Sequence, residues 1–354
     1  MKSVILKGNK KISLQENKIS NLKDNQCLVK ISYAGICSSD IYRGFEGWAY
    51  KYPLVMGHEI SGKVVKTKKI KNNIKIGDRV SIFPLLPCFK CNQCSENNFM
   101  RCVKYGYYGS RNDGGFAEYI VVNSWNILKI PKNVDLLNAS LIEPLAVVIH
   151  AYKKINIKKN KKILLLGSGF LSLIFQKIIR FYFPNLYICV VDRNNYKLQL
   201  AKKYTSKVKT LNIEKKLKLD NFIKNNEDFF DIIIETTGDP KFYKEAINLS
   251  APNGEIILLS NIIDNLKLSK KIVSNILRKE LLIKGTWNSY FKKSLKTDDW
   301  KDSLRLIKKG IKPSELVTKI IKLSDIPIYL KKMHKHKTKR KKINYVKFVS
   351  INND

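Results

Sequence analysis

The middle of the chain alternates apolar runs of strand length with stretches of helical pattern. This alternation is typical of parallel strands covered by helices, because both faces of each strand are buried and each crossover is helical. We therefore predict an α/β doubly wound parallel sheet of the dinucleotide-binding kind over residues 151–286. The apolar runs are KKILLLGSG (161–169), LYICVVDR (186–193), SKVKTLNI (206–213), DIIIETTG (231–238), GEIILLSN (254–261) and LLIKGTW (281–287).

The first apolar run breaks into GSGFLS (167–172), where a helix should begin. Gly167 suits a tight turn, and Gly169 lets the backbone approach a pyrophosphate at the helix N-terminus. Asp192 ends the second run, where a carboxylate binds an adenosine ribose and disfavours a 2′-phosphate, so NAD is favoured over NADP. A purely structural glycine turn and an ordinary strand-end aspartate remain alternatives. The predicted cofactor-binding residues are Gly167, Gly169, Phe170, Leu171, Asp192 and Arg193.

The first 150 residues have a different pattern, with short strands separated by Gly, Pro, Asn and Asp. This pattern predicts an all-β domain with inserted loops. After residue 287 the chain contains a helical pattern in DDWKDSLRLIKKG and a final strand in INYVKFVSI. A lone terminal strand needs a sheet to join. We therefore predict a discontinuous domain of residues 1–150 and 287–354, with the domain at 151–286 inserted into it.

The charge of the chain is extreme: its 354 residues carry a net charge of +38. Such a charge promotes non-specific attraction to nucleic acid and acidic surfaces. The lysines are spread along the chain, so we interpret most of the charge as compositional bias and keep polyanion binding as the alternative. The densest cluster, KKMHKHKTKRKK (331–342), is expected to be a solvated loop.

The apolar stretch at 163–179 is not expected to cross a membrane. It contains two glycines, two serines, Gln176 and Lys177, and it is slightly short for a span of about 20 residues. The N-terminal sequence MKSVILKGNKKISLQ lacks the sustained apolar run of a signal peptide. We therefore expect a cytoplasmic protein.

Four of the seven cysteines lie in CFKCNQCSENNFMRC (88–102), namely Cys88, Cys91, Cys94 and Cys102. Buried free thiols are disfavoured here because the neighbouring residues are mostly polar. Disulfides suit small secreted chains, and nothing in this sequence indicates secretion. Four closely spaced thiolates can complete the tetrahedral shell of one Zn²⁺ ion. The loop therefore predicts a closed structural zinc site, which has no open position for chemistry.

A second set of possible metal ligands is scattered over the chain: Cys37 in GICSSD, His58 and Glu59 in GHE, and Glu143 in IEPLAV. Catalytic zinc is held by three protein ligands plus water, with the ligands drawn from separate segments. Each residue alone also has an ordinary explanation, as a core thiol, a core histidine or a helix-entry carboxylate.

The combination of motifs resembles the zinc-dependent medium-chain dehydrogenases over essentially the whole chain. The resemblance implies a GroES-like catalytic domain with an inserted Rossmann domain, and an oxidoreductase that acts on CH–OH groups with zinc and NAD. It is carried by GICSSD, GHEISG, GDRV, the cysteine loop, GGFAEYIVV, IEPLAV, GSGFLS and VVDR. Three stretches are most similar to the polyol-phosphate branch: FPLLPCFKC (83–91), YGSRNDGGFAEYIVV (108–122) and ILRKELLIKGTWNSY (276–290).

The resemblance also implies roles for single residues. Cys37, His58 and Glu143 match catalytic zinc ligands, Glu59 matches a second-shell or alternate ligand, and Ser39 matches the hydroxyl that passes the alcohol proton outward. The four clustered cysteines match the structural zinc lobe, which gives two zinc ions per subunit. Departures from the family pattern are Ser38, Tyr42, Lys68 and Ser172.

The expected reaction is oxidation of a secondary alcohol of a polyol or polyol phosphate, of the galactitol 1-phosphate type, to a ketose or ketose phosphate. An unphosphorylated polyol or L-threonine is the alternative substrate, and a non-catalytic zinc-binding or nucleic-acid-binding protein is the alternative of another class. Arg111 or Lys51 is the candidate for a phosphate contact, and the stretch 288–290 for contacts with polyol hydroxyls. The resemblance implies a homo-dimer or homo-tetramer and no membrane or specific nucleic-acid partner.

Overall fold

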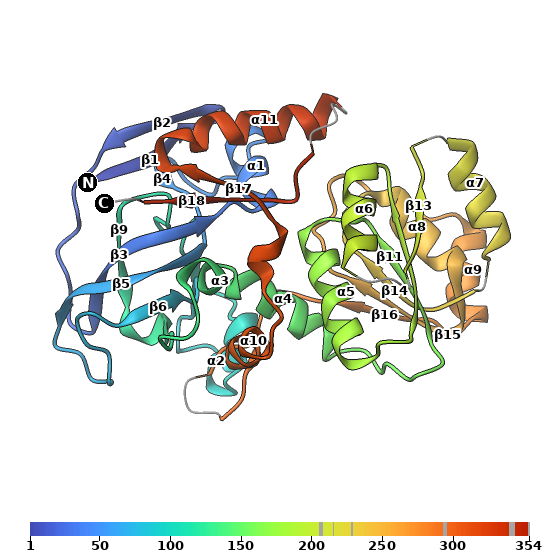
Figure 1. Cartoon of the computed structure of the whole chain (residues 1–354), viewed down its shortest axis with the longest axis horizontal. Coiled ribbons are helices and arrows are strands. Elements are labelled where there is room, and N and C mark those ends of the chain that lie inside the picture. Colours follow the sequence, from blue (N-terminus) through green and yellow to red (C-terminus); the bar gives the residue numbers. More distant parts are fainter. Residues whose placement is uncertain (205–207, 215, 228, 293–295, 340–343, 353–354) are drawn as a thin grey trace. The chain divides into compact units, whose positions relative to one another are not determined.

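The computed structural model describes residues 1–204, 208–214, 216–227, 229–292, 296–339 and 344–352. The chain divides into two compact units (Figure 1). The first comprises residues 1–146 with most of the chain after 288, and the second comprises residues 147–288 with 344–346. Each unit has its own sheets and its own core.

The second unit contains a sheet of six parallel strands. Numbered 1 to 6 along the chain, the strands lie side by side in the order 3-2-1-4-5-6. This is the doubly wound order of dinucleotide-binding domains. The predicted α/β sheet is therefore confirmed. In spatial order the strands are β13 (Val208–Asn212), β12 (Tyr187–Asp192), β11 (Lys162–Leu166), β14 (Phe230–Glu235), β15 (Ser250–Leu258) and β16 (Leu282–Gly285).

Helices cover this sheet because the strands are apolar on both faces. One face, with Leu164, Cys189 and Ile233, packs on side chains from α7, α8 and α9. Figure 1 shows α5 and α6 in front of the sheet. The helices are α5 (Phe170–Tyr182), α6 (Asn195–Lys203), α7 (Lys216–Asn225), α8 (Pro240–Leu249) and α9 (Lys270–Arg278).

The first unit is built on a sheet of seven strands, which confirms the β-rich part of the predicted fold. The last strand of the chain joins it, since β18 pairs antiparallel with β3 at Val349 and Gly35. β3 also pairs with β5, and Gly35 lies opposite Glu59. The strands are β3 (Gln26–Gly35), β5 (Glu59–Lys68), β6 (Arg79–Ile82), β9 (Tyr119–Asn123), β10 (Ile127–Lys129), β17 (Val317–Lys322) and β18 (Lys347–Ile351).

Smaller elements complete the first unit. The remaining strands are β1 (Lys2–Gly8), β2 (Lys11–Glu16) and β4 (Leu54–Val55), which form a three-stranded sheet, and β7 (Leu85–Leu86) and β8 (Gly106–Tyr107), which pair with each other. The helices are α1 (Ser38–Phe45), α2 (Asn92–Ser95), α3 (Leu136–Ser140), α10 (Asp299–Lys308) and α11 (Ile326–Lys339), and α4 (Ile142–Tyr152) runs from the first unit into the second.

The lysine cluster at 331–342 was wrongly expected to be a loop. Its residues up to Lys339 belong to α11, and residues 340–342 lie outside the described part. Ile326, Leu330 and Met333 are buried on this helix, at the spacing of one helical face. The abundant lysines conceal this short apolar stripe in the sequence.

Within the described residues, no helix is both long and apolar enough to cross a membrane. The stretch 163–179 instead divides between a buried strand, β11, and the start of α5.

Candidate metal and cofactor sites

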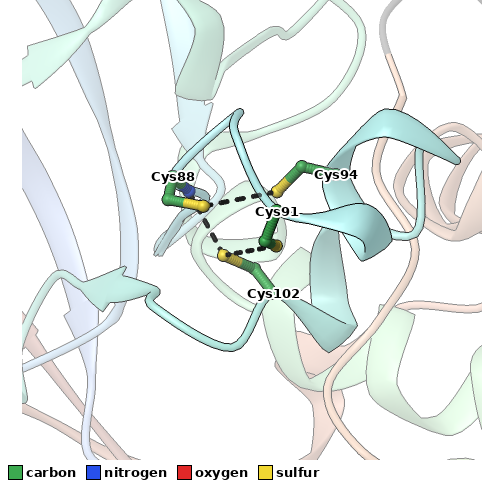
Figure 2. A group of neighbouring side chains, drawn as sticks. All are labelled: Cys88, Cys91, Cys94 and Cys102. Carbon is green, nitrogen blue, oxygen red and sulfur yellow. Dashed lines mark hydrogen bonds between the residues drawn. The ribbon is translucent and has the colours of Figure 1, made fainter.

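The four clustered cysteines turn their sulfur atoms toward a common centre (Figure 2). All four sulfurs lie within 4.8 Å of one another, with 4.0 Å between Cys88 and Cys94 and 3.9 Å between Cys91 and Cys102. A tetrahedral ion with sulfurs at about 2.3 Å places neighbouring sulfurs about 3.8 Å apart, whereas a disulfide needs about 2.05 Å. The arrangement therefore fits a metal ion and excludes disulfides among these four residues.

Local backbone geometry holds the sulfurs of this cysteine lobe. The amide of Cys88 donates to the sulfur of Cys102 at 3.2 Å, and Cys91 is the N-cap of α2. Amides of Val103 and Cys94 lower the pKa of Cys91 to about 6, whereas burial raises the pKa of Cys94 to about 12. Four thiolates in such a small volume repel one another, so the fully ionised set requires a cation at its centre.

A second cluster lies where β3 and β5 pair. Cys37 follows β3 as the N-cap of α1, while His58 directly precedes β5 and Glu59 is its first residue. Because Gly35 pairs with Glu59, the three side chains converge, and their ligand atoms lie within 4.8 Å of one another. A Cβ atom at Gly35 would lie 2.0 Å from Oε2 of Glu59, so only glycine leaves room for this carboxylate.

Glu143 is beside this cluster but outside the set of donors that lie within 4.8 Å of one another. Its buried carboxylate accepts a 3.2 Å hydrogen bond from the hydroxyl of Tyr107 and is close enough to His58 and Glu59 for their charges to affect its pKa. Glu59, which the sequence assigned as a second-shell or alternate ligand, is thus among the three converging donors. Glu143, assigned as a direct ligand, is not.

Buried charged side chains position the second cluster. Asp40 is fully buried; its Oδ2 accepts from the amide of Cys37 at 2.9 Å, and its Oδ1 lies 3.7 Å from Nδ1 of His58. Arg43 donates to the same carboxylate at 3.2 Å and to the hydroxyl of Ser39 at 2.9 Å. Asp40 follows Cys37 by three residues, so the CSSD motif contained a signal for it that the sequence analysis missed.

Lys347, on β18, is the cation that faces Glu59. Its ammonium donates to Oε1 of Glu59 at 2.5 Å, and both side chains are buried. The other carboxylate oxygen, Oε2, is buried without a hydrogen-bond partner. Such an oxygen costs free energy unless it is satisfied, and with a thiol and an imidazole nearby it forms a mixed donor set that suits zinc. The residues therefore fit a metal ion.

Mutual charge shifts the pKa values in this cluster. Burial raises the pKa of the Cys37 thiol. A hydrogen bond and the charge of His58 outweigh this effect, so the pKa of Cys37 lies below the ordinary cysteine value of 9.0. Burial lowers the pKa of His58. The charge of Asp40 and the hydrogen bond and charge of Cys37 outweigh this effect, so the pKa of His58 is raised to about 9. Burial also raises the pKa of Glu143 to about 7. Without a metal, the cluster thus favours the protonated imidazole of His58.

In the second unit, the glycine turn lies where β11 ends and α5 begins. Gly167 has a φ of +93°, and a Cβ atom there would lie 2.7 Å from the hydroxyl oxygen of Thr236. Gly169 has an extended conformation, and a Cβ atom there would meet nothing within 4 Å. The space beside Gly169 is therefore open at the helix N-terminus, where a phosphate would be stabilised.

The other predicted cofactor residues surround this turn. Asp192 ends β12, and its carboxylate accepts from the amides of Ser168 at 2.7 Å and Asn194 at 2.8 Å. Phe170 and Leu171 begin α5, and Arg193 is exposed beyond Asp192. These hydrogen bonds fix the carboxylate next to the glycine turn.

Two further sequence assignments need comment. Ser172, which replaces a glycine of the fingerprint, is fully buried, so the small side chain is accommodated. Ser289, expected among residues that contact polyol hydroxyls, is fully buried, and its hydroxyl accepts from the indole of Trp300 at 2.9 Å. We therefore withdraw Ser289 as a substrate contact, because its hydroxyl is enclosed by the packing around Trp300.

Comparisons with known proteins agree with this architecture. Residues 23–132 match the alcohol dehydrogenase GroES-like domain, and residues 185–309 match the zinc-binding dehydrogenase family. The chain is 31% identical to galactitol 1-phosphate 5-dehydrogenase of Escherichia coli K12, with 87% of this chain and 88% of the relative covered. It is 27% identical to D-xylulose reductase A of Aspergillus oryzae, covering 91% of this chain and 90% of the relative.

A solved structure shows the same likeness in three dimensions. The crystal structure of galactitol-1-phosphate dehydrogenase from Escherichia coli superposes with a TM-score of 0.86 at 27% identity, covering 99% of this chain and 100% of the other. The enzyme class that these relatives share is an oxidoreductase that acts on CH–OH groups of small molecules. The chain therefore belongs to the zinc-binding dehydrogenases of the medium-chain, alcohol dehydrogenase-like family.

Proposed function

We propose that this protein is an NAD-dependent zinc dehydrogenase that oxidises a secondary alcohol of a hexitol phosphate to a ketose phosphate. The observation that carries the proposal is the convergence of Cys37, His58 and Glu59, with one buried carboxylate oxygen left unsatisfied. The identity of 31% to a galactitol 1-phosphate dehydrogenase supports the substrate class.

Cys37, His58 and either Glu59 or Glu143 would hold the catalytic zinc, and the four cysteines of the lobe would hold a structural zinc. When bound, the catalytic ion supplies Lewis acidity that lowers the pKa of an alcohol hydroxyl. Asp40 lies 3.7 Å from Nδ1 of His58 and acts on it through charge, and the hydroxyl of Tyr107 donates a hydrogen bond to the carboxylate of Glu143. A hydrogen-bonded neighbour such as Tyr107 fixes the orientation of a metal ligand.

Ser39 would receive the alcohol proton. One lone pair of its hydroxyl accepts from Arg43, which leaves the second lone pair for the substrate hydroxyl and the O–H to pass a proton on. A bound NAD would supply the hydride acceptor, so the alcohol would lose two electrons and two hydrogens in total. Asp192 and the turn at Gly167 and Gly169 would bind the adenosine half of NAD.

A substrate panel tests the proposal. Zinc-replete protein is assayed with hexitol 1-phosphates, the matching free hexitols and L-threonine, each with NAD and with NADP, before and after chelation. Because a hydrogen bond to a charged group contributes about 1.5–3 kcal/mol, we expect at least about a tenfold preference for the phosphate. We also expect NAD to be preferred and chelation to abolish turnover.

An alternative substrate is a free polyol, which the likeness to a D-xylulose reductase favours. Equal use of free and phosphorylated hexitols would leave only this alternative. If no alcohol reduces either cofactor, the enzymatic proposal fails and a non-catalytic zinc-binding role replaces it.

We also propose a homo-dimer or homo-tetramer. β16 is an edge strand of the parallel sheet, and its side chains Leu282 and Ile283 are 53% and 40% exposed. Unprotected apolar edge strands pair readily with other chains. Light scattering that gives the mass of a single chain at micromolar concentration would refute the assembly.

A further inference from the structure

Arg111 has an arrangement that the metal sites do not explain. Its guanidinium carbon lies 3.8 Å from the ring centroid of Tyr50 and 4.1 Å from that of Tyr105. Arginine stacks on aromatic rings through the face of its guanidinium. The N–H donors point outward from the edge of that plane, so they remain available for hydrogen bonds.

Arg111 has no acidic partner in the part of the chain that the structure describes. Two other arginines of this unit do, since Arg43 pairs with Asp40 at 3.2 Å and Arg305 pairs with Asp302 at 2.8 Å, while Arg79 donates to backbone carbonyls instead. The aromatic rings around Arg111 neutralise none of its charge. A fixed guanidinium without a carboxylate is suited to bind an anion from solution.

The loop that contains Arg111 is packed directly on the backbone next to His58. The amide of Gly115 donates to the carbonyl of Gly57 at 2.7 Å. A Cβ atom at Gly109 or Gly114 would lie 2.4 Å or 2.1 Å from that carbonyl oxygen, so only glycine permits the contact. The loop therefore holds Arg111 at a set position relative to the metal cluster, as a binding site requires.

Two aromatic rings lie between Arg111 and the cluster. The ring of Tyr105 is 6.4 Å from that of Tyr107, which in turn is 5.9 Å from the ring of His58. A ligand that reaches both the metal cluster and Arg111 must carry its anionic group away from the alcohol that reacts. A hexitol phosphate oxidised near its unphosphorylated end meets this requirement.

We propose that Arg111, held by Tyr50 and Tyr105, binds the phosphate of the substrate and so selects phosphorylated hexitols. This inference rests on the proposed function, because it names the residue that recognises the substrate class of the same site. A phosphate monoester offers several acceptor oxygens, and the guanidinium can donate two parallel hydrogen bonds to them. Lys51, the other candidate from the sequence, has no comparable aromatic support in any described contact.

The test measures kcat/KM for a hexitol 1-phosphate and for the same free hexitol in Arg111→Met. We expect kcat/KM for the phosphate substrate to fall at least about tenfold, mostly through a higher KM, and kcat/KM for the free hexitol to stay within about twofold of wild type. Inorganic phosphate serves as a competitive inhibitor, and its inhibition of Arg111→Met should be weaker than that of the wild-type protein by a similar factor. Lys104→Met is the matched control, because it removes an exposed charge near Tyr105 and should change neither substrate.

A second variant guards against a folding defect. Tyr50 is 63% exposed, so Tyr50→Leu should fold normally while it loosens the guanidinium. This variant should lower kcat/KM only for the phosphate substrate, by about threefold. If wild-type protein uses both substrates equally, the phosphorylated substrate of the proposed function is wrong. If wild-type protein prefers the phosphate and Arg111→Met keeps that preference, or weakens both substrates alike, the role of Arg111 is overturned while the proposed function stands.

Discussion

The two metal-ligand clusters of this protein differ in how the chain assembles them. The cysteine lobe takes four identical donors from one segment, Cys88 to Cys102, and its sulfurs are held largely by backbone amides. The second cluster takes a thiol, an imidazole and a carboxylate from where two paired strands end and begin, and the charged side chains of Asp40 and Lys347 lie beside it. A closed, uniform shell suits structure, and a mixed shell with adjustable protonation suits chemistry.

The largest expected effect is on turnover, and it should come from the second cluster alone. His58→Ala removes one of the three converging donors. Changing even a residue that only hydrogen-bonds to a metal ligand lowers metal affinity or activity about 10–100-fold, so loss of a ligand itself should lower turnover by more than about a hundredfold. NAD binding should persist, because the dinucleotide residues lie in the other unit. Steady-state rates and NAD titration check this, with His150→Ala as control. Full activity in His58→Ala would remove the catalytic assignment.

The next effect should be on stability, and it should come from the lobe. Cys91→Ser breaks the four-sulfur shell, and loss of a structural zinc costs folding free energy directly. A loss of about 3 kcal/mol would lower Tm by roughly 6–12 °C in a unit of this size. Calorimetry and zinc analysis should show this decrease and one zinc fewer per chain. Ser95→Ala, an exposed change in the same lobe, should alter neither quantity. Unchanged Tm with lost turnover would reverse the two roles.

The smallest effect concerns pH and zinc affinity in metal-free protein. His58, with a pKa of about 9, must lose its proton before zinc can bind, so affinity at this cluster should rise with pH, by at least about threefold from pH 7.0 to 7.5. In the lobe, Cys94 has a pKa of about 12 and that of Cys102 is also raised. At least these two protons must leave, so the same pH step should raise zinc affinity at the lobe at least about tenfold.

Zinc titration calorimetry in buffers with different ionisation enthalpies counts these protons for each cluster. His58→Ala isolates the lobe, and Cys91→Ser isolates the second cluster. Zinc binding that releases no proton at His58, or fewer than two at the lobe, would contradict these raised pKa values.

The sequence alone predicted the elements whose signals are local. The cysteine spacing between 88 and 102 predicted a lobe that the structure assembles from one segment. The apolar runs and the turn at Gly167 predicted the parallel sheet, because strand burial and glycine turns depend on neighbouring residues. The GICSSD and GHE motifs supplied Cys37, His58 and Glu59, although only family resemblance linked them before the structure was known.

Tertiary structure decided the partners of those residues. Lys347 reaches Glu59 only because β18 pairs with β3, and no pattern near Lys347 distinguishes it from the other lysines of the chain. Arg111 gains its aromatic neighbours from Tyr50, on a distant loop, and from Tyr105. The helix α11 is stabilised by burial of Ile326, Leu330 and Met333 against the first unit. Residues far apart in sequence lack local signals for such contacts, because the free energy that selects them arises only when the strands pair and the core is packed.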